Sequence, residues 1–235
     1  MTFAGKSTVE EIRARFDRDV ERFSNLETGQ TATMDATCCL DLIARAAATT
    51  TPQINAVLDV GCGAGNFSIK LREKAPAARF TLIDLSEPML ARARERLGAS
   101  TAVCHQTDIR AAGFADESFD VIVAAAVLHH LRTPAEWRLV FQNFHRWLRP
   151  GGSLWVFDLV AHENVTIQNL LWGEYGKYLE TLGGTAYREK VFAYVTQEDT
   201  PTPLTYQLDL LRSVGFLHID VLHKKACFAA YGGVK

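Results

Sequence analysis

The sequence predicts an α/β fold with a mostly parallel, doubly wound sheet of seven strands. Short apolar runs alternate with amphipathic stretches of helical length, which is typical of parallel strands covered by helices on both faces. The last two apolar runs are joined by only residues 223–225. So short a connection predicts an antiparallel hairpin at the C-terminal end of the chain.

A helical lid is expected before the sheet. Four apolar residues spaced by four, four and three positions share one helix face: Ile12, Phe16, Val20 and Phe23. A second helical pattern covers residues 35–48. The segment 46–52 is small and polar and ends in proline, which stops a helix. We therefore expect a lid at residues 1–50 and one larger domain at residues 51–235.

The larger domain holds all the expected strands. They are predicted at residues 56–60, 80–84, 102–104, 119–125, 153–158, 217–222 and 226–231. Helices are predicted between them at residues 66–74, 86–97, 135–148 and 204–214. Residues 162–200 interrupt the alternation with an aromatic-rich and mostly helical segment, which we interpret as a cap insertion.

Composition excludes several classes of protein. Of the 235 residues, 48% are hydrophobic and 22% charged, which disfavours a disordered chain. With 25 basic and 27 acidic residues, no basic field attracts nucleic acid. No apolar run is long enough for a membrane helix or a signal peptide. The five cysteines form no disulfide framework, so a cytoplasmic location is expected.

The strongest functional signal is a glycine-rich turn after the first expected strand. Gly61, Gly63 and Gly65 follow Asp59 closely. Glycine permits backbone torsions that side chains forbid and lets a ligand approach the chain. The pattern departs from the dinucleotide fingerprint, because Asn66 stands where the third glycine is required, and a phosphate loop's lysine is missing.

Acidic residues flank this turn. Asp84 ends the second expected strand, 23 residues after Gly61, where a carboxylate can accept both hydroxyls of a ribose. Asp59 would repel a phosphate and suits a cationic ligand. The pattern predicts a site for a cationic nucleoside, with a glycine turn that binds nothing as the alternative.

Five segments, in order, resemble the motifs of class I S-adenosylmethionine-dependent methyltransferases: residues 57–65, 82–86, 107–109, 119–123 and 148–152. The resemblance implies a Rossmann-like fold, S-adenosylmethionine as the cofactor and S-adenosylhomocysteine as the product. It also implies that the glycines pass beneath the methionine part and that Asp84 binds the ribose. Asp108 and Ile109 then flank the adenine, and Asp108 accepts a hydrogen bond from its amino group.

The resemblance places the methionine end of the cofactor near the backbone of Ala124 and Ala125, with further contacts from Gln30 and Met34 of the lid. The complete set of residues expected at the cofactor is Asp59, Gly61, Cys62, Gly63, Gly65, Asp84, Leu85, Asp108, Ile109, Ala124, Ala125, Gln30 and Met34.

Two histidines follow the fourth expected strand, at the sheet edge where ligands bind in open α/β folds. Methyl transfer from a sulfonium mainly needs an oriented acceptor and the exclusion of water. His129 or His130 is a candidate general base for an acceptor that must lose a proton. The alternative is that one imidazole packs locally and the other only lines the pocket. No metal site is expected, because no third ligand stands at a suitable spacing.

The cap is expected to cover a small-molecule acceptor. Its aromatic side chains suit a flat or apolar compound: Trp172, Tyr175, Tyr178, Tyr187, Phe192 and Tyr194. Tyr175 is a candidate catalytic residue, and Glu174 is a candidate for orienting the acceptor. Packing of the cap onto the sheet is the favoured explanation for most of these aromatics, and the same surface suits a homodimer interface.

A small-molecule methyltransferase is the leading hypothesis, with three alternatives. The arrangement of the lid, residues 158–160, the cap and the final helix also resembles the carboxy-S-adenosylmethionine synthase group. That reaction needs a cap arginine, yet residues 191–211 hold no Arg or Lys and Arg188 stands alone nearby. A tRNA-modifying methyltransferase needs clustered cations, whereas the arginines here are interleaved with acidic residues. The last alternative is a cofactor-binding subunit without activity.

Overall fold

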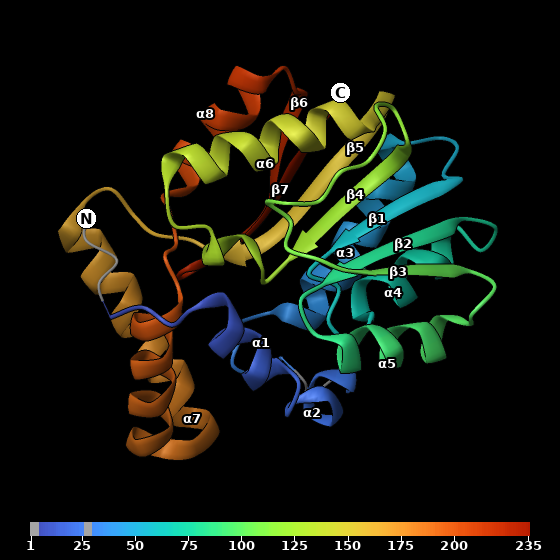
Figure 1. Cartoon of the computed structure of the whole chain (residues 1–235). Helices are drawn as coiled ribbons and strands as arrows, with labels where there is room; N and C mark the ends of the chain where they lie inside the picture. Colours follow the sequence, from blue (N-terminus) through green and yellow to red (C-terminus); the bar gives the residue numbers. More distant parts are fainter. Residues whose placement is uncertain (1–4, 26–29) are drawn as a thin grey trace.

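One mixed sheet of seven strands runs through the molecule in the order β3–β2–β1–β4–β5–β7–β6 (Figure 1). The computed structural model describes residues 5–25 and 30–235. The strands are β1 Ala56–Val60, β2 Arg79–Asp84, β3 Ala102–Gln106, β4 Phe119–Ala125, β5 Leu148–Leu159, β6 Leu217–Lys225 and β7 Phe228–Val234. Strands β1 to β5 pair in parallel, and β7 pairs antiparallel with both β5 and β6. The predicted fold class is confirmed.

Alternating residues of the central strands face two separate cores. In β4, Val121 and Val123 belong to one apolar cluster, whereas Ile122 and Ala124 belong to the other. Helices α3 Ala36–Thr50, α4 Asn66–Lys74 and α5 Glu87–Leu97 cover the first cluster. Helices α6 Pro134–Trp147 and α8 Leu204–Val214 cover the second. Because both faces are covered, β4 is apolar from Val121 to Ala125 and does not alternate. Asp120, near its start, pairs with Arg149 at 2.7 Å.

The C-terminal hairpin turns later than predicted. Strand β6 continues to Lys225, which pairs with Phe228, so the turn consists of Ala226 and Cys227. The predicted connection at residues 223–225 is therefore wrong in position. Ala226 adopts a φ of +46°, as two-residue hairpin turns require, and a non-glycine residue there gave no sequence signal.

The expected lid contains three helices, of which two lie over the pocket and one packs in the core. Helices α1 Val9–Phe16 and α2 Val20–Ser24 lie between α5 and α7 in Figure 1, and a short turn separates them. Helix α3, which the sequence grouped with them, packs on α4 and β5 in the core. Residues 1–4 and 26–29 of the expected lid lie outside the described residues.

The cap is a helical hairpin. Helix α7 spans Val165–Glu198, but Gly183 and Gly184 have non-helical torsions and turn the chain back (Figure 1). The returning half ends beside α1, where the guanidinium of Arg15 donates to both carboxylate oxygens of Glu198 at 2.7–3.1 Å. None of the described helices combines the length and the apolar character needed to cross a membrane.

Candidate functional site

A pocket opens at the carboxyl ends of β1, β2 and β4, beneath α1 and α2. It encloses about 1150 Å³ of space, including the solvent at its mouth. The loop after β1 forms one side, and the apolar side chains of α1 and α2 form the other. This is the edge at which ligands bind in open α/β sheets.

The glycine loop shapes the floor of this pocket. Gly61 and Gly63 have φ angles of +62° and +49°, which side chains rarely adopt. A Cβ on Gly61 would stand 2.7 Å from the Cβ of Val127, whereas nothing lies within 4 Å of one on Gly63. Gly61 therefore allows close packing against the loop after β4, and Gly63 leaves open space in the pocket.

Asp84 ties this loop to the next strand. Its Oδ2 accepts a hydrogen bond from the Gly63 amide and its Oδ1 from the Ser86 amide, both at 2.9 Å. Burial raises the pKa of Asp84, although these amides oppose the shift. A carboxylate has lone pairs for about four hydrogen bonds, so Asp84 retains acceptor capacity toward the pocket.

Asp59 brings a second carboxylate to the same wall. Its side chain is buried, and its Oδ2 accepts a hydrogen bond from the Ser68 hydroxyl at 2.6 Å. Burial raises the pKa of Asp59 to about 7. Burial disfavours the charged form of this carboxylate, and a neighbouring cation would stabilise that form.

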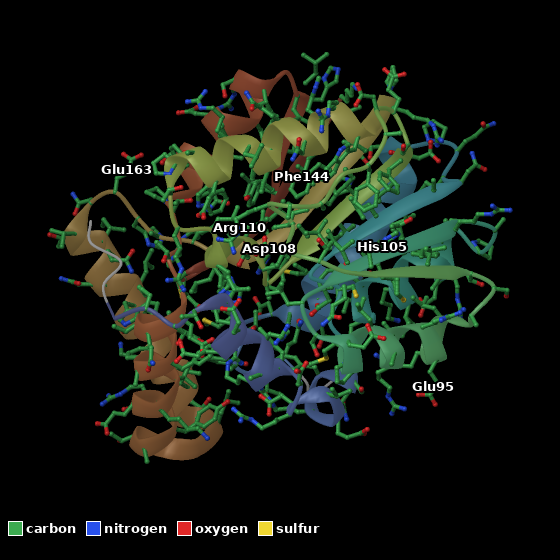
Figure 2. All side chains as sticks on the ribbon, in the orientation of Figure 1. Glu95, His105, Asp108, Arg110, Phe144 and Glu163 are labelled. Atoms are coloured by element: carbon green, nitrogen blue, oxygen red, sulfur yellow. The ribbon has the colours of Figure 1, made fainter. Side chains whose placement is uncertain are left out.

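Asp108 is held by an arginine that sequence reasoning missed. Arg110 donates to Asp108 through its backbone amide and Nε, both at 2.9 Å, and through Nη2, and it also reaches Glu136 at 2.8 Å. Figure 2 shows Asp108 and Arg110 side by side. Burial raises the pKa of Asp108, but Arg110 outweighs this and holds that pKa below its usual value. The clamp keeps Asp108 ionised at the pocket wall.

Most of the residues expected at the cofactor line this pocket: Asp59, Gly61, Cys62, Gly63, Asp84, Leu85, Asp108, Ile109, Ala125 and Gln30. Three others do not. Met34 and Ala124 are buried in the two apolar cores, and Gly65 is the N-cap of α4. The contacts that each residue makes with a cofactor stay predictions.

The apolar wall comes from the N-terminal helices. It consists of Val9, Ile12, Phe16 and Phe23. Among the described residues, none of the six cap aromatics lines the pocket. The hydroxyl of Tyr175 donates to the Ala32 carbonyl at 2.8 Å, and its ring packs on Phe228 of β7. Tyr175 thus contacts the core and the segment before α3, and its catalytic role stays a prediction without a contact to the pocket.

The two histidines lie in different surroundings, in the short helix η1 Leu128–His130. The Nδ1 of His129 is hydrogen-bonded to the carboxylate of Asp158, which also accepts the Leu128 amide at 2.7 Å. Burial opposes a charge on His129, but Asp158 and Asp199 outweigh it and raise its pKa to about 9. His130 lines the pocket, and burial holds the pKa of His130 well below its usual value. His130 is therefore neutral at physiological pH.

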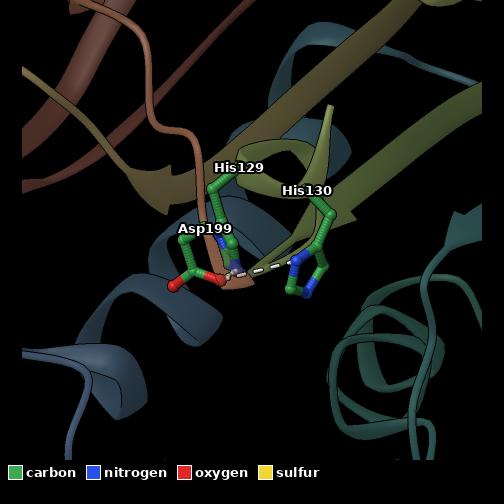
Figure 3. Close-up of side chains that lie close together, drawn as sticks. All are labelled: His129, His130 and Asp199. Atoms are coloured by element: carbon green, nitrogen blue, oxygen red, sulfur yellow. Dashed lines mark ion pairs between the residues drawn. The ribbon is translucent and has the colours of Figure 1, made fainter. Parts of the chain in front are cut away.

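Asp199, at the end of α7, completes this cluster. Its Oδ1 lies 3.6 Å from Nε2 of His129 and 3.4 Å from Nδ1 of His130 (Figure 3). The Thr200 amide donates to the His129 carbonyl at 2.7 Å and holds the two segments together. Sequence spacing showed no third ligand beside the histidines, because Asp199 is 70 residues further along the chain.

Comparisons with known proteins agree with this architecture. Residues 57–152 match the family model described as a methyltransferase domain. An uncharacterized methyltransferase of Mycobacterium tuberculosis is 32% identical over 116 residues, which is 49% of this chain and 55% of that protein. A putative methyltransferase of Bacillus subtilis is 36% identical over 110 residues, or 46% and 43% of the two chains. The chain therefore spans about half the length of the curated relatives it matches.

Solved structures share the fold over most of the chain. A putative O-methyltransferase from Nostoc punctiforme superimposes with a TM-score of 0.62 at 17% identity, covering 88% of this chain and 59% of that one. Human N-acetylserotonin methyltransferase in complex with S-adenosylmethionine gives a TM-score of 0.61 at 16% identity, covering 99% and 63%. Residues 57–152 of this chain thus match a methyltransferase domain, and the chain shares its Rossmann-like fold with solved methyltransferase structures.

Proposed function

We propose that this chain transfers the methyl group of S-adenosylmethionine to a small-molecule acceptor and releases S-adenosylhomocysteine. One observation carries the proposal. A single pocket joins the glycine loop and the carboxylates of the methyltransferase domain to an apolar wall from α1 and α2. Such a pocket has one side for a cationic nucleoside and another for an apolar group.

The residues of the pocket fit S-adenosylmethionine. Asp84 has acceptor capacity for a ribose diol, and the open space at Gly63 admits a close approach to the backbone. Asp59 suits a positive charge, because burial disfavours its carboxylate when no cation is near. When bound, S-adenosylmethionine supplies a methyl group that its sulfonium has already activated. The chain's own residues then have to orient the acceptor and exclude water.

The N-terminal helices exclude water from the pocket. Phe16 and Phe23 cover the pocket with apolar surface. The bidentate pair of Arg15 with Glu198 fixes α1 to the end of α7 at 2.7–3.1 Å. An acceptor beneath α1 meets the neutral imidazole of His130, which can take a proton from a hydroxyl or amine. A pocket covered in this way suits a small molecule better than a macromolecule.

The alternative functions gain less from the structure. Arg188, the arginine that a carboxy-S-adenosylmethionine synthase would use, is paired with Glu180 at 2.6 Å and does not line the pocket. Arg92, in one of the two arginine clusters, is paired with Glu95 at 2.8 Å, which weakens its attraction for a nucleic-acid backbone.

Two measurements test the proposal. Calorimetry is expected to show one S-adenosylhomocysteine bound per chain. A screen of metabolites with methyl-labelled S-adenosylmethionine is expected to transfer label to a small molecule, with chain boiled beforehand as the control. Labelling of tRNA alone, or no binding of S-adenosylhomocysteine at any accessible concentration, would show that the proposed function is wrong.

Asp59 makes cofactor affinity depend on pH. In the free protein the pKa of Asp59 is raised to about 7 by burial. A bound cation lowers the pKa of Asp59. At pH values between this lowered pKa and about 7, binding therefore releases the proton of Asp59. Affinity for S-adenosylmethionine is expected to rise with pH from about pH 5 to 7 and then level off. The rise is at most about tenfold for each pH unit crossed.

Calorimetry across this range measures the effect, and buffers with different heats of ionisation count the protons released. Asp59→Asn cannot titrate at this position and is the matched variant. Its affinity is expected to be flat over the same range. A slope that persists in Asp59→Asn contradicts the assignment and places the titrating group elsewhere in the pocket.

A further inference from the structure

Three side chains with metal-binding chemistry, two buried and one half-buried, meet beside the pocket. One potential ligand atom from each of His129, His130 and Asp199 lies within 4.8 Å of the other two (Figure 3). The two imidazoles come from η1 after β4, and the carboxylate comes from the end of α7. Within the described part of the chain, no other three residues of this kind are grouped so closely.

This cluster does not satisfy its own polar atoms. Over the described residues, neither ring nitrogen of His130 nor Oδ1 of Asp199 makes a hydrogen bond of normal geometry. The side chain of Asp199 is only 3% exposed, and that of His129 only 10%. Buried polar atoms without partners are costly, and two of these, Nδ1 of His130 and Oδ1 of Asp199, face each other at 3.4 Å.

We propose that His129, His130 and Asp199 bind a divalent transition-metal ion. Two imidazoles and one carboxylate are a donor set that Zn²⁺ and Fe²⁺ accept, with coordination positions left for water or substrate. Ligand atoms about 2.0–2.1 Å from a tetrahedral Zn²⁺ stand about 3.4 Å from one another. The carboxylate oxygen of Asp199 lies 3.6 and 3.4 Å from the two imidazole nitrogens, close to this separation, and all three potential ligand atoms lie within 4.8 Å of one another.

A second carboxylate already orients one of the ligands. Asp158 accepts a hydrogen bond from Nδ1 of His129, which turns Nε2 toward Asp199. Asp158 is itself fixed by the amides of Leu128 and Leu159 at 2.7 Å. Histidines that bind metals usually donate their other ring nitrogen to a carboxylate in this manner.

The charge of the cluster also favours a dication. Asp158 and Asp199 both face the imidazoles, and Glu198 is paired with Arg15. The one further cation that contacts Asp199 among the described residues is Lys6, whose ammonium donates to its backbone carbonyl and not to its carboxylate. A proton on His129 satisfies Asp158 but leaves Oδ1 of Asp199 without a hydrogen bond within the described residues. One divalent ion between the three ligands offsets both carboxylates and supplies the missing partner.

The site adjoins the pocket, because His130 belongs to both. A bound ion places a Lewis acid near the acceptor, and a metal-bound hydroxyl or thiol loses its proton to solvent at a lower pH than the free group. In that case the ion takes over the deprotonation for which neutral His130 is otherwise available. This consequence rests on the proposed methyl transfer, whereas the metal site itself does not.

The test measures metal binding without cofactor or acceptor. The full chain, freed of affinity tag and treated with a chelator, is titrated with Zn²⁺ in competition with a chromophoric chelator. We expect one Zn²⁺ per chain with at least micromolar affinity. Asp199→Asn and His130→Gln are each expected to weaken that affinity about 100-fold, and Asp158→Asn, which acts through His129, about 10-fold.

Matched controls come from metal-binding side chains elsewhere. His162→Gln removes an imidazole that contacts Gln168 and Lys224, and Cys38→Ser removes an exposed thiol. Both are expected to leave the affinity unchanged. Co²⁺ bound in place of Zn²⁺ is expected to give visible absorption bands that Asp199→Asn abolishes.

Failure of the wild-type chain to bind one equivalent of Zn²⁺ overturns the proposal. Zn²⁺ affinity that is unaltered in Asp199→Asn and in His130→Gln also overturns it. Circular dichroism verifies the fold of each variant, and if one does not fold, the other decides. Since no methyl donor is present in the metal titration, its failure would not affect the interpretation of the methyl-transfer assays.

Discussion

Asp84→Asn is expected to weaken the binding of S-adenosylhomocysteine by about 100-fold or more. A hydrogen bond to a charged acceptor contributes roughly 1.5–3 kcal/mol, and the carboxylate is expected to accept two from the ribose. Asparagine also has only one acceptor oxygen, so one of the hydrogen bonds from the amides of Gly63 and Ser86, which shape the loop, is lost. Calorimetry on the purified variant measures the change in the dissociation constant.

The matched control is Glu87→Gln. Glu87 begins α5, three residues after Asp84, and is exposed, so this variant removes the same charge without removing an acceptor in the pocket. Its affinity is expected to stay within about twofold, because exposed charges are screened. If Asp84→Asn binds S-adenosylhomocysteine within threefold of the wild-type chain, the ribose assignment is wrong.

Local patterns were sufficient to predict the sheet. Apart from Asp59 and Asp120, the residues of β1 and β4 are apolar on both faces because helices cover both faces, and such runs are recognisable from the sequence alone. The hairpin was misplaced because the turn needs a positive φ at Ala226, and the residue type there does not reveal it. The strands could thus be predicted from their apolar residues, whereas the position of the hairpin turn depended on the backbone torsion of Ala226.

The glycine side of the pocket was predictable for a similar reason. Gly61 and Gly63 follow β1, and Asp84 ends the adjacent strand β2. Their positions in the sequence therefore predict that they lie close together in the fold. Asp199 comes from a distant segment and has no such signal. The cap aromatics had a composition that suited a binding site, but composition does not say which way a ring faces, and Tyr175 faces the core.

Gly61→Ala is expected to lower the free energy of unfolding by about 2–5 kcal/mol. Gly61 has a φ of +62°, and a left-handed torsion costs a residue with a Cβ roughly 1–2 kcal/mol. That Cβ would also stand 2.7 Å from the Cβ of Val127 and closer still to its Cγ2, and overpacking adds about 1–3 kcal/mol. Urea unfolding measures the loss, and cofactor binding is expected to disappear with the displaced loop.

Gly63→Ala separates the two causes. Its φ of +49° imposes a comparable backbone strain, but nothing lies within 4 Å of the added Cβ. This variant is expected to lose only the roughly 1–2 kcal/mol of strain in the free protein. The affinity of Gly63→Ala for S-adenosylhomocysteine is expected to fall below that of the wild-type chain, because the added methyl group occupies space at the pocket floor. Equal losses of stability in the two variants would show that contact with Val127 does not contribute, and that strain alone limits this loop.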